Sequence, residues 1–428
     1  MLKGCKNYMI DRLREIALDA FKAGVDAADP ALALRASLKH HPLPKPAPNG
    51  KRYFFGIGKA AVAMMKEALS NRDEFPYTAF VVTNYENATK IDGVEIIAAG
   101  HPVPDENGLR ATMRIKELAT EATSKDEVIV LISGGGSALL PAPKDGLTLD
   151  EKMMINDLLL KSNFDITEMN LVRQNLSFLK GGKLAALCTP ASVTAYILSD
   201  VIGDNLNVVA SGPTAQLIGS PNEAKTLLIQ REVWTQIPAK AQSLLNEGSN
   251  FAPLLPKAEN HLIGSNHFAA STMAQKAGAE LSRTPLNGEV SAAVDMCLQK
   301  IEKQSGKQSF ALAWGGETTV NVTGTGKGGR NQEFSLRFAI EAQKRLQSGN
   351  WCFLSGATDG RDGPTEAAGG LVDHKSLSRI LDAGAIPQEF LVSNDSYHAL
   401  KLSGDLLEIG ATGTNVADLQ LFLFEPLI

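Results

Sequence analysis

Residues 127–137 contain the feature that most constrains the fold, an apolar run that leads directly into glycine. The run from Glu127 to Ile132 has Val-Ile-Val-Leu-Ile at its centre and shows no alternation of polar and apolar residues. A strand that is apolar on both faces needs cover on both faces, and parallel sheets flanked by helices supply it. We therefore expect an α/β fold with ligands bound beyond the carboxyl ends of the strands.

The loop after this strand is a candidate site for an anionic group. Ser133 and Ser137 flank three consecutive glycines, Gly134, Gly135 and Gly136. The glycines expose neighbouring backbone N–H groups, and the serines add hydroxyl donors. Because the strand, the glycines and the donors coincide, we expect a substrate carboxylate or phosphate here rather than a plain flexible turn.

Residues 51–69 predict a strand, a glycine turn and a helix. Gly56 and Gly58 fit the relaxed dinucleotide fingerprint G-x-G-x-x-A. Lys59 lies inside the turn, where it could meet a phosphate, although surface lysines often only extend into solvent. The acid expected to bind a ribose is not clearly placed, and Glu86 is the only candidate.

Carboxylates follow two other predicted strands. Asp200 and Asp204 come just after the apolar run at residues 191–198, and Asp359 and Asp362 lie in a later glycine-rich loop. Such groups can bind Mg²⁺ or accept a proton from a hydroxyl. Aspartate also makes turns, which is the simpler interpretation.

Residues 314–333 form a second glycine-rich stretch that opens a helix near Asn331. A helix N-terminus with fixed positive charge beside it attracts anions. We expect a phosphate-binding loop here. Its candidate residues are Glu317, Gly326, Lys327, Gly328, Gly329 and Arg330, with Asn266 at the end of another predicted strand as a further polar contact.

Two further groups carry weaker signals. A helix predicted over residues 167–183 contains Arg173, Lys180 and Lys183. These basic residues are most simply a solvated face, and Arg173 is the candidate substrate contact among them. His101, between Gly and Pro, is more often a turn residue than a catalytic base.

Charge and cysteine content restrict the classes of partner. The chain has 47 acidic and 42 basic residues and a net charge of −5, which argues against binding to nucleic acid or to an anionic membrane. The four cysteines are scattered without C-x-x-C, as in proteins of a reducing compartment. No apolar leader or membrane span is apparent, so we expect a cytoplasmic protein.

Several motifs resemble one known family. GGETTVNVTGTGKGGRNQE, SGATDGRDGPTEAAGGLVD and ATGTNVADL strongly resemble the C-terminal MOFRL domain of the type-2 glycerate kinases. Upstream, FFGIGKAA, GHPVPDENG, LISGGGSALLPAP and LSDVIGDNLNVVASGPT are similar to the rest of that family. The resemblance runs from about residue 8 to the end of the chain.

The resemblance implies a fold and a reaction. It implies a Rossmann-like, mostly parallel sheet with helices on both faces at residues 1–250, and an α/β MOFRL domain at residues 256–428. It also implies transfer of the γ-phosphoryl group of ATP to the 2-hydroxyl of D-glycerate, giving 2-phospho-D-glycerate and ADP. ATP and Mg²⁺ are the expected cofactors, and a homodimer is left open.

Phosphoryl transfer consists mostly of positioning and neutralising charge, which assigns roles to the candidates. Lys59, a proposed active-site lysine in the family, and Arg330 would neutralise phosphates, and Asp200 would accept the hydroxyl proton. Arg173 and the loop at residues 133–137 would hold the substrate. The remaining assignments are Gly56, Gly58, Glu317, Asn266 and the loop at residues 326–329 for the nucleotide, and Asp204, Asp359 and Asp362 for the metal.

Two other functions stay open on the sequence. An NAD(P)H-dependent hydroxypyruvate reductase would use the G-x-G-x-x-A turn and matches an older name in the family, but the ribose acid is missing and Lys59 occupies the turn. A non-catalytic sugar-acid sensor would use the Ser/Gly loop, but no DNA-binding segment is visible. No P-loop supports the ATP site independently, since position 321 is Asn and not Gly.

Overall fold

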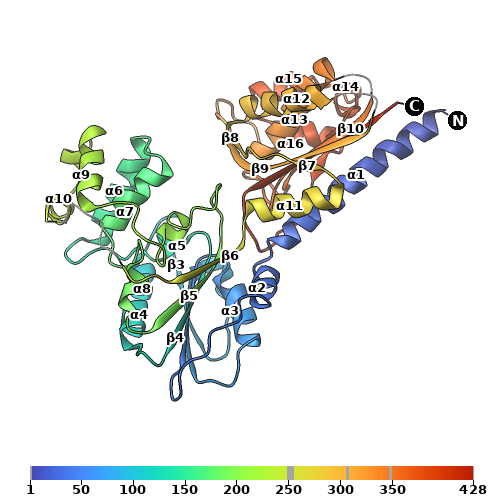
Figure 1. Cartoon of the computed structure of the whole chain (residues 1–428). Coiled ribbons are helices and arrows are strands. Elements are labelled where there is room, and N and C mark those ends of the chain that lie inside the picture. Colours follow the sequence, from blue (N-terminus) through green and yellow to red (C-terminus); the bar gives the residue numbers. More distant parts are fainter. Residues whose placement is uncertain (1, 248–254, 305–307, 347–348, 428) are drawn as a thin grey trace. The chain divides into compact units, whose positions relative to one another are not determined.

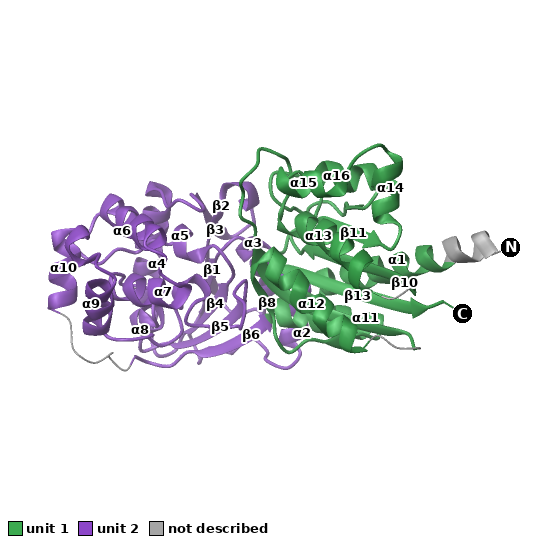
Figure 2. Cartoon of the chain, turned by 90° about the horizontal axis from the view of Figure 1, so that it is seen from above, with its two compact units in different colours: residues 1–29, 264–428 green, residues 30–263 purple. Residues whose placement is uncertain are grey.

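The computed structural model describes residues 2–247, 255–304, 308–346 and 349–427. The chain divides into two compact units (Figure 2). Unit 1 comprises residues 1–29 and 264–428, and unit 2 comprises residues 30–263. Each unit has its own sheet and its own apolar core.

This division differs from the expected one at both ends. The first helix, α1 (Leu2–Ala27), belongs to unit 1 because its apolar face packs on α11 (Asn266–Ala277) and β10 (Gly349–Ala357). Gly24 permits this approach, since a Cβ there would lie 2.9 Å from the carbonyl oxygen of Ala269. The expected boundary at residues 250–256 falls largely on residues 248–254, which lie outside the described residues.

Unit 2 contains the parallel sheet that the apolar strands predict. Its strand order is β3-β2-β1-β4-β5-β6, the order of the doubly wound dinucleotide-binding fold. Figure 1 labels β3, β4, β5 and β6 of this sheet. The β1–β2, β2–β3, β1–β4 and β4–β5 pairs are all parallel. The strands are β1 (Arg52–Ile57), β2 (Tyr77–Asn84), β3 (Val94–Ala99), β4 (Glu127–Ile132), β5 (Ser192–Leu198) and β6 (Glu259–Gly264).

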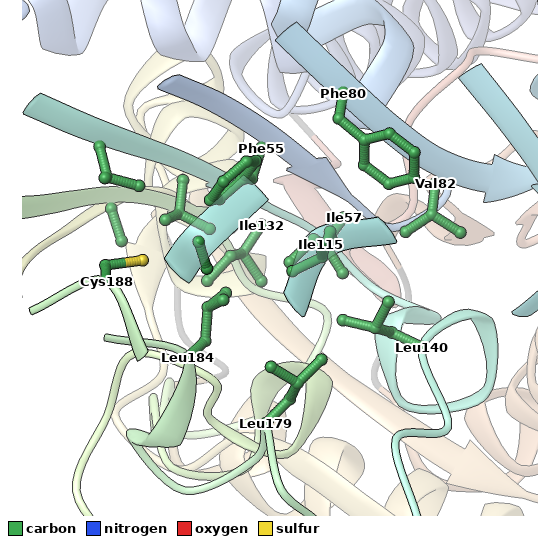
Figure 3. Close-up of a cluster of buried hydrophobic side chains, with 14 of the residues drawn as sticks. Phe55, Ile57, Phe80, Val82, Ile115, Ile132, Leu140, Leu179, Leu184 and Cys188 are labelled. Atoms are coloured by element: carbon green, nitrogen blue, oxygen red, sulfur yellow. The ribbon is translucent and has the colours of Figure 1, made fainter. Parts of the chain in front are cut away.

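The core of unit 2 covers both faces of this sheet. Phe54 and Phe55 lie on opposite faces of β1 and are both fully buried. Figure 3 shows one face, where strand residues such as Phe55 and Val82 lie with Ile115, Leu179 and Leu184 from other segments. The sequence order reverses between β1 and β4, so the ends of these two strands form the switch point where such folds bind ligands.

The helices of unit 2 connect the strands, and several form a separate layer. α6, α7, α9 and α10 pack on one another around a small apolar cluster. The α-helices are α2 (Pro30–Leu38), α3 (Ala61–Ser70), α4 (Glu106–Glu121), α5 (Gly136–Leu139), α6 (Leu149–Lys161), α7 (Ile166–Asn175), α8 (Lys183–Leu187), α9 (Pro221–Gln230) and α10 (Ala239–Asn246). Short 3₁₀ turns are η1 (Tyr85–Asn87), η2 (Val209–Ser211) and η3 (Trp234–Gln236).

Unit 1 contains a mixed sheet in the order β12-β11-β10-β13-β9-β7, with β8 also paired to β9. Its core stacks Phe338 on Phe353, with ring centroids 3.8 Å apart. The strands are β7 (Glu280–Leu281), β8 (Leu286–Glu289), β9 (Phe310–Thr319), β10, β11 (Gly369–Asp373), β12 (Leu406–Leu407) and β13 (Asp418–Pro426). The other helices are α12 (Val290–Gln304), α13 (Arg330–Arg345), α14 (Ser376–Asp382), α15 (Pro387–Val392) and α16 (Ser396–Ser403).

Among the described residues, no helix combines the length and the apolar character that crossing a bilayer requires.

Candidate active site

The loops after β1 and β4 bind each other at the switch point of unit 2. The backbone N–H of Lys59 donates to the carbonyl oxygen of Gly134 at 2.9 Å. The N–H of Ala60 donates to Ser133 Oγ at 3.0 Å. Gly58 has a φ of +125°, and a Cβ there would lie 2.3 Å from Ser133 Oγ. Ser133 is buried, and its hydroxyl oxygen joins the two loops by accepting the hydrogen bond from Ala60. The predicted substrate contact at Ser133 stays a prediction.

Three polar side chains surround the next two glycines. A Cβ on Gly134 would lie 2.0 Å from Asp200 Oδ2. A Cβ on Gly135, whose φ is +84°, would lie 3.1 Å from Lys59 Cγ and 3.2 Å from His101 Nε2. The glycines are therefore required because the side chains of Lys59, His101 and Asp200 pass directly over the backbone of this loop.

His101, which the sequence ranked as a turn residue, belongs to this group. Desolvation and the nearby Lys59 charge lower the pKa of His101, and Glu86 acts in the opposite direction. The imidazole is therefore mainly neutral at pH 7 and able to accept a proton.

A cavity of about 550 Å³ lies beside the loop, entirely within unit 2. Its walls come from the turn at His101, the residues after Gly135, α6 and the end of α7. Met153, Met154 and Leu160 make part of its lining apolar. Its volume is typical of small-molecule sites, which span about 300–1,000 Å³.

Three basic side chains line this cavity. Lys152 and Lys180 are only 4% and 2% exposed. Lys180 Nζ donates to the carbonyl oxygen of Ser137 at 3.0 Å, and Arg173 Nε donates to Asn156 Oδ1 at 2.9 Å. Within the described part of the chain, no carboxylate forms an ion pair with any of the three cations.

The electrostatics of the cavity favour an anionic ligand. Burial and the charge of Arg173 lower the pKa of Lys152 to about 7. Burial, Lys152 and Arg173 lower the pKa of Lys180 well below its usual range. Since the cations destabilise one another, a bound anion would relieve their repulsion and raise both pKa values.

The structure corrects the interpretation of residues 167–183. Lys180 does not lie on a solvated face, because α7 ends at Asn175 and the chain turns inward at Gly181 and Gly182, which have φ of +62° and +80°. Lys152 was missed altogether. The available signal was its spacing, since it shares the buried stripe of α6 with Leu149, Ile155 and Leu159.

Gly135, Ser137 and Arg173 are the predicted substrate residues that reach the cavity. Ser137 Oγ lies 2.5 Å from Ser211 Oγ, a buried hydroxyl, which fixes the Ser137 side chain. Gly136 instead provides space for packing, since a Cβ there would lie 2.7 Å from Ala210 Cβ.

In unit 1, Arg330 is held by two carboxylates. Its Nε and Nη2 donate to Asp418 at 2.6 and 3.0 Å, and its Nη1 lies 2.7 Å from Glu317 Oε1. Burial raises the pKa of Asp418, and Arg330 opposes that shift. Glu317, which was predicted to contact the nucleotide, therefore contacts Arg330.

A carboxylate of the protein itself, that of Asp362, caps the N-terminus of α13. The backbone N–H groups of Asn331 and Gln332 donate to Asp362 at 3.2 and 2.8 Å. A Cβ on Gly329 would lie 2.3 Å from Asp362 Cγ. Asp362, which was predicted to bind metal, therefore caps α13, and it occupies the helix end that was expected to bind phosphate.

The loop before α13 also uses its N–H groups internally. Gly324 N donates to Asn394 Oδ1, Gly326 N to the Ser393 carbonyl, and Lys327 N to Asp395 Oδ1, at 2.8, 2.8 and 2.9 Å. These donors bind the loop at residues 393–395, so Gly326 and Lys327 do not present backbone donors to phosphate. The Lys327 ammonium lies over the Tyr397 ring at 4.5 Å.

The remaining predicted residues differ in their contacts and in their exposure. Asn266 Nδ2 donates to the carbonyls of Val416 and Asp418 at 2.8 and 2.9 Å and so anchors β13. Asp359 Oδ1 accepts from the Arg361 N–H at 3.0 Å, as in a turn, yet the side chain stays partly exposed. Asp204 is also partly exposed, at a position with a φ of +54°.

The predicted catalytic residues are divided between the two units. Unit 2 holds Lys59, Asp200 and the basic cavity, and unit 1 holds Arg330. The predicted convergence of Lys59 and Arg330 on one phosphate stays a prediction.

A doubly wound unit with a cavity lined by basic residues beside its switch point is typical of α/β enzymes that act on small anionic molecules. Residues 16–246 match the family described as a domain of unknown function (DUF4147), and residues 310–418 match the MOFRL family. The chain is 38% identical to the D-glycerate 2-kinase of Thermotoga maritima, over 96% of this chain and 99% of that protein. It is 34% identical to the glycerate 2-kinase of Pyrococcus horikoshii, over 94% and 96%.

Solved structures agree with these relatives. The crystal structure of the Thermotoga maritima glycerate kinase superposes with a TM-score of 0.88 at 36% identity, covering 97% of this chain and 100% of that one. A second crystal structure, of a Pyrococcus horikoshii protein, gives a TM-score of 0.82 at 32% identity, with 97% and 99% covered. The chain therefore belongs to the glycerate 2-kinase family, as its motifs predicted.

Proposed function

We propose that this protein is a glycerate 2-kinase that transfers the γ-phosphoryl group of ATP to the 2-hydroxyl of D-glycerate. The observation that carries this proposal is the buried group of cations in the unit 2 cavity, beside Lys59 and Asp200. The cavity supports a small anionic substrate, and the relatives named as glycerate 2-kinases identify which one.

The substrate carboxylate fits the Lys180 end of the cavity. Lys180 and Arg173 supply charge-assisted donors, which are stronger than neutral hydrogen bonds. Ser137 adds a hydroxyl whose orientation Ser211 fixes. Binding here would place a three-carbon acid beside the Gly134–Gly135 backbone, over which Lys59 and Asp200 pass.

Lys59 and Asp200 are positioned for the transfer itself. The backbone of Lys59 is fixed to Gly134, so its side chain leaves a rigid turn and can neutralise charge on the transferring phosphoryl group. Asp200 follows β5 and can accept the proton of the attacking hydroxyl. His101 is a second acceptor in the same group.

Arg330 would add positive charge from unit 1. Asp418 and Glu317 hold three of its nitrogens, which fixes the plane of the guanidinium. This arrangement makes Arg330 a preoriented cation, and we propose that it contacts phosphate oxygens through its remaining donors.

Mg²⁺ fits the carboxylate oxygens of Asp204. The ion usually keeps several waters and takes one or two carboxylates together with substrate phosphates. Asp204 is partly exposed and follows the same strand as Asp200, and Asp359 is a further carboxylate in unit 1. When bound, Mg²⁺ supplies charge neutralisation on the nucleotide phosphates.

A hydroxypyruvate reductase is the second candidate. It is favoured by the glycine turn after β1 and by a relative from Agrobacterium vitis with a provisional hydroxypyruvate reductase name, 35% identical over 96% of this chain. Two observations count against a reductase. Glu86, the only candidate for the acid that binds ribose, accepts a hydrogen bond from Asn84. The long side chain of Lys59 leaves the turn where a dinucleotide phosphate would lie.

One pair of assays separates the two functions. Purified protein is given D-glycerate, ATP and Mg²⁺ with coupled detection of ADP, and in parallel hydroxypyruvate with NADH. We expect ADP release with D-glycerate, and ³¹P and ¹³C NMR spectra that show phosphorylation at C2. NADH oxidation without ADP release, or phosphorylation at C3, would overturn the proposal.

A further inference from the structure

Unit 2 carries a cluster of metal-binding side chains outside the basic cavity. His41, Glu259 and His261 each offer one ligand atom, and all three atoms lie within 4.8 Å of one another. None of the three lines the cavity or belongs to the loops at the switch point. From this cluster we propose a binding site for a zinc-class divalent cation, independent of phosphoryl transfer.

Strand geometry places two of the ligands on one face. Glu259 and His261 are alternate residues of β6, so their side chains project from the same side of the strand. Asn260, between them, projects the other way and exchanges hydrogen bonds with Thr214, 2.6 Å from its hydroxyl and 3.1 Å from its carbonyl oxygen. The strand is thereby held, and the Glu259–His261 pair is oriented before any metal arrives.

The third ligand comes from the segment after α2. The His41 ring stacks on the His261 ring, with centroids 4.1 Å apart and planes inclined by 26°. The backbone at His41 is fixed because the buried hydroxyl of Tyr196 donates to its carbonyl oxygen at 2.8 Å. The His41 side chain itself is exposed and can rotate toward the pair.

The distances suit a tetrahedral ion. His261 Nε2 and Glu259 Oε1 are 3.1 Å apart. Bonds of about 2.0–2.2 Å to zinc put neighbouring ligands of a tetrahedron roughly 3.3–3.6 Å apart. A small rotation of His41 completes three protein ligands and leaves the fourth position to water.

The donor set also selects the class of ion. Two imidazoles and one carboxylate suit zinc and its neighbours among the transition metals, whereas Mg²⁺ prefers oxygen ligands only. The site would join the segment that follows α2, just after the chain enters unit 2 at Pro30, to the strand that ends at Gly264, where the chain leaves it. A bound ion would therefore stabilise unit 2 where its first and last segments meet.

The test is direct binding of Zn²⁺ to the full-length, chelator-treated protein without nucleotide. Titration against a chromophoric zinc indicator should show one tight equivalent of Zn²⁺ that excess Mg²⁺ does not displace. The His41→Ala and His261→Ala variants should each weaken that equivalent at least about tenfold, which corresponds to about 1.4 kcal/mol. Co²⁺ in place of Zn²⁺ should give the visible absorption of a four-coordinate site, and the variants should lose it.

Matched histidines provide the controls. His40→Ala removes an exposed neighbour of His41, and His398→Ala disrupts the His398–Asp395 pair of unit 1, whose atoms are 2.6 Å apart. Both variants should bind Zn²⁺ like the unmodified protein. Loss of the tight equivalent in either control, or its persistence in both His41→Ala and His261→Ala, would overturn the proposal.

Two measurements separate binding from folding. The metal-free melting temperature of every variant should match that of the unmodified protein, and Zn²⁺ should raise the melting temperature only where the three ligands are intact. The Glu259→Gln variant keeps the size of the side chain and leaves the stacked His41 and His261 rings in place. It should lose affinity for Zn²⁺ to the same extent as the histidine variants. Kinase activity with Mg²⁺ should be unchanged in His41→Ala. An affinity that stays intact in Glu259→Gln would contradict the three-ligand site.

Discussion

The ammonium group of Lys180 donates a hydrogen bond to the carbonyl oxygen of Ser137 at 3.0 Å, in the wall of the unit 2 cavity. This contact joins the end of the β4 loop to a lysine that follows α7. It places a buried amine next to Ser137, which was expected to meet the substrate.

Replacing Lys180 by methionine should weaken glycerate binding without weakening the fold. A charge-assisted hydrogen bond contributes about 1.5–3 kcal/mol, so we expect the KM for glycerate to rise by roughly ten- to a hundredfold. The melting temperature should stay the same or rise, because methionine keeps the volume and removes a buried charge. Lys161→Met is the matched control, since Lys161 is exposed on α6 and pairs with Asp157 at 2.7 Å. An unchanged KM in Lys180→Met would remove Lys180 from the binding site.

The lowered pKa of Lys152, about 7, predicts opposite pH trends for binding and stability. Above pH 7 the folded protein loses the Lys152 proton, so kcat/KM for glycerate should fall as the pH rises to 9. The unfolded chain keeps that proton up to about pH 10.4, so it binds more protons and the free energy of unfolding should increase over the same range.

The Lys152→Met variant checks both trends. It should flatten the pH dependence of kcat/KM above pH 7, and urea unfolding at pH 7 and pH 9 should show a smaller gain in stability than the unmodified protein. Identical profiles for the variant and the unmodified protein would assign the titration to another group.

Lys59→Ala should lower kcat by at least about a hundredfold, the scale of losing one transition-state contact to a developing charge. Lys59 leaves the turn fixed by Gly134, and its side chain passes over Gly135 beside the cavity. Lys66→Ala removes an exposed lysine from α3, the helix that follows the Lys59 turn, and should leave kcat unchanged. If Lys59→Ala retained full turnover in the coupled ADP assay, the phosphate would have to be held elsewhere.

Arg330→Ala should lower both activity and stability. Its removal leaves the fully buried Asp418 without its partner, and breaking such a pair costs about 3–5 kcal/mol. We also expect kcat to fall by at least about a hundredfold, if Arg330 meets phosphate. The double variant Arg330→Ala, Asp418→Asn separates the two effects, because it should recover much of the stability and none of the activity. Recovery of both would make Arg330 purely structural.

Asp200→Asn and Asp204→Asn should affect different kinetic parameters. Loss of a general base costs about 10²–10⁴-fold, so Asp200→Asn should lower kcat with little change in the KM for glycerate. Asp204→Asn should instead raise the Mg²⁺ concentration required for half-maximal activity. Steady-state kinetics over a Mg²⁺ series distinguish these outcomes, and a reversal of the two phenotypes would exchange the assignments.

Much of the architecture could be predicted from local patterns. The apolar run at residues 127–132 predicted a central parallel strand, and β4 lies there with parallel neighbours on both sides. The sequence also predicted glycine turns after the first and the central strand, and such turns follow β1 and β4. These features depend on side chains that are near one another in sequence, which is why a pattern reveals them.

The partners of polar groups could not be predicted in the same way. Asp362 looked like a metal ligand, but it caps a helix that begins 32 residues earlier, at Arg330. The donors of Gly326 and Lys327 looked free for phosphate, but residues of a distant loop accept them. A buried polar group must be paired, and the sequence does not say which distant segment supplies the partner.

The sequence by itself determined the strands, the glycine turns and, through its motifs, the family of this protein. Only the tertiary structure decided which charges are available, showing Lys152 and Lys180 in a cavity and Arg330 already held by Asp418. The physical reason is that a strand or a turn follows from short-range backbone preferences. The pairing of a charge follows from contacts between segments that only the folded chain brings together.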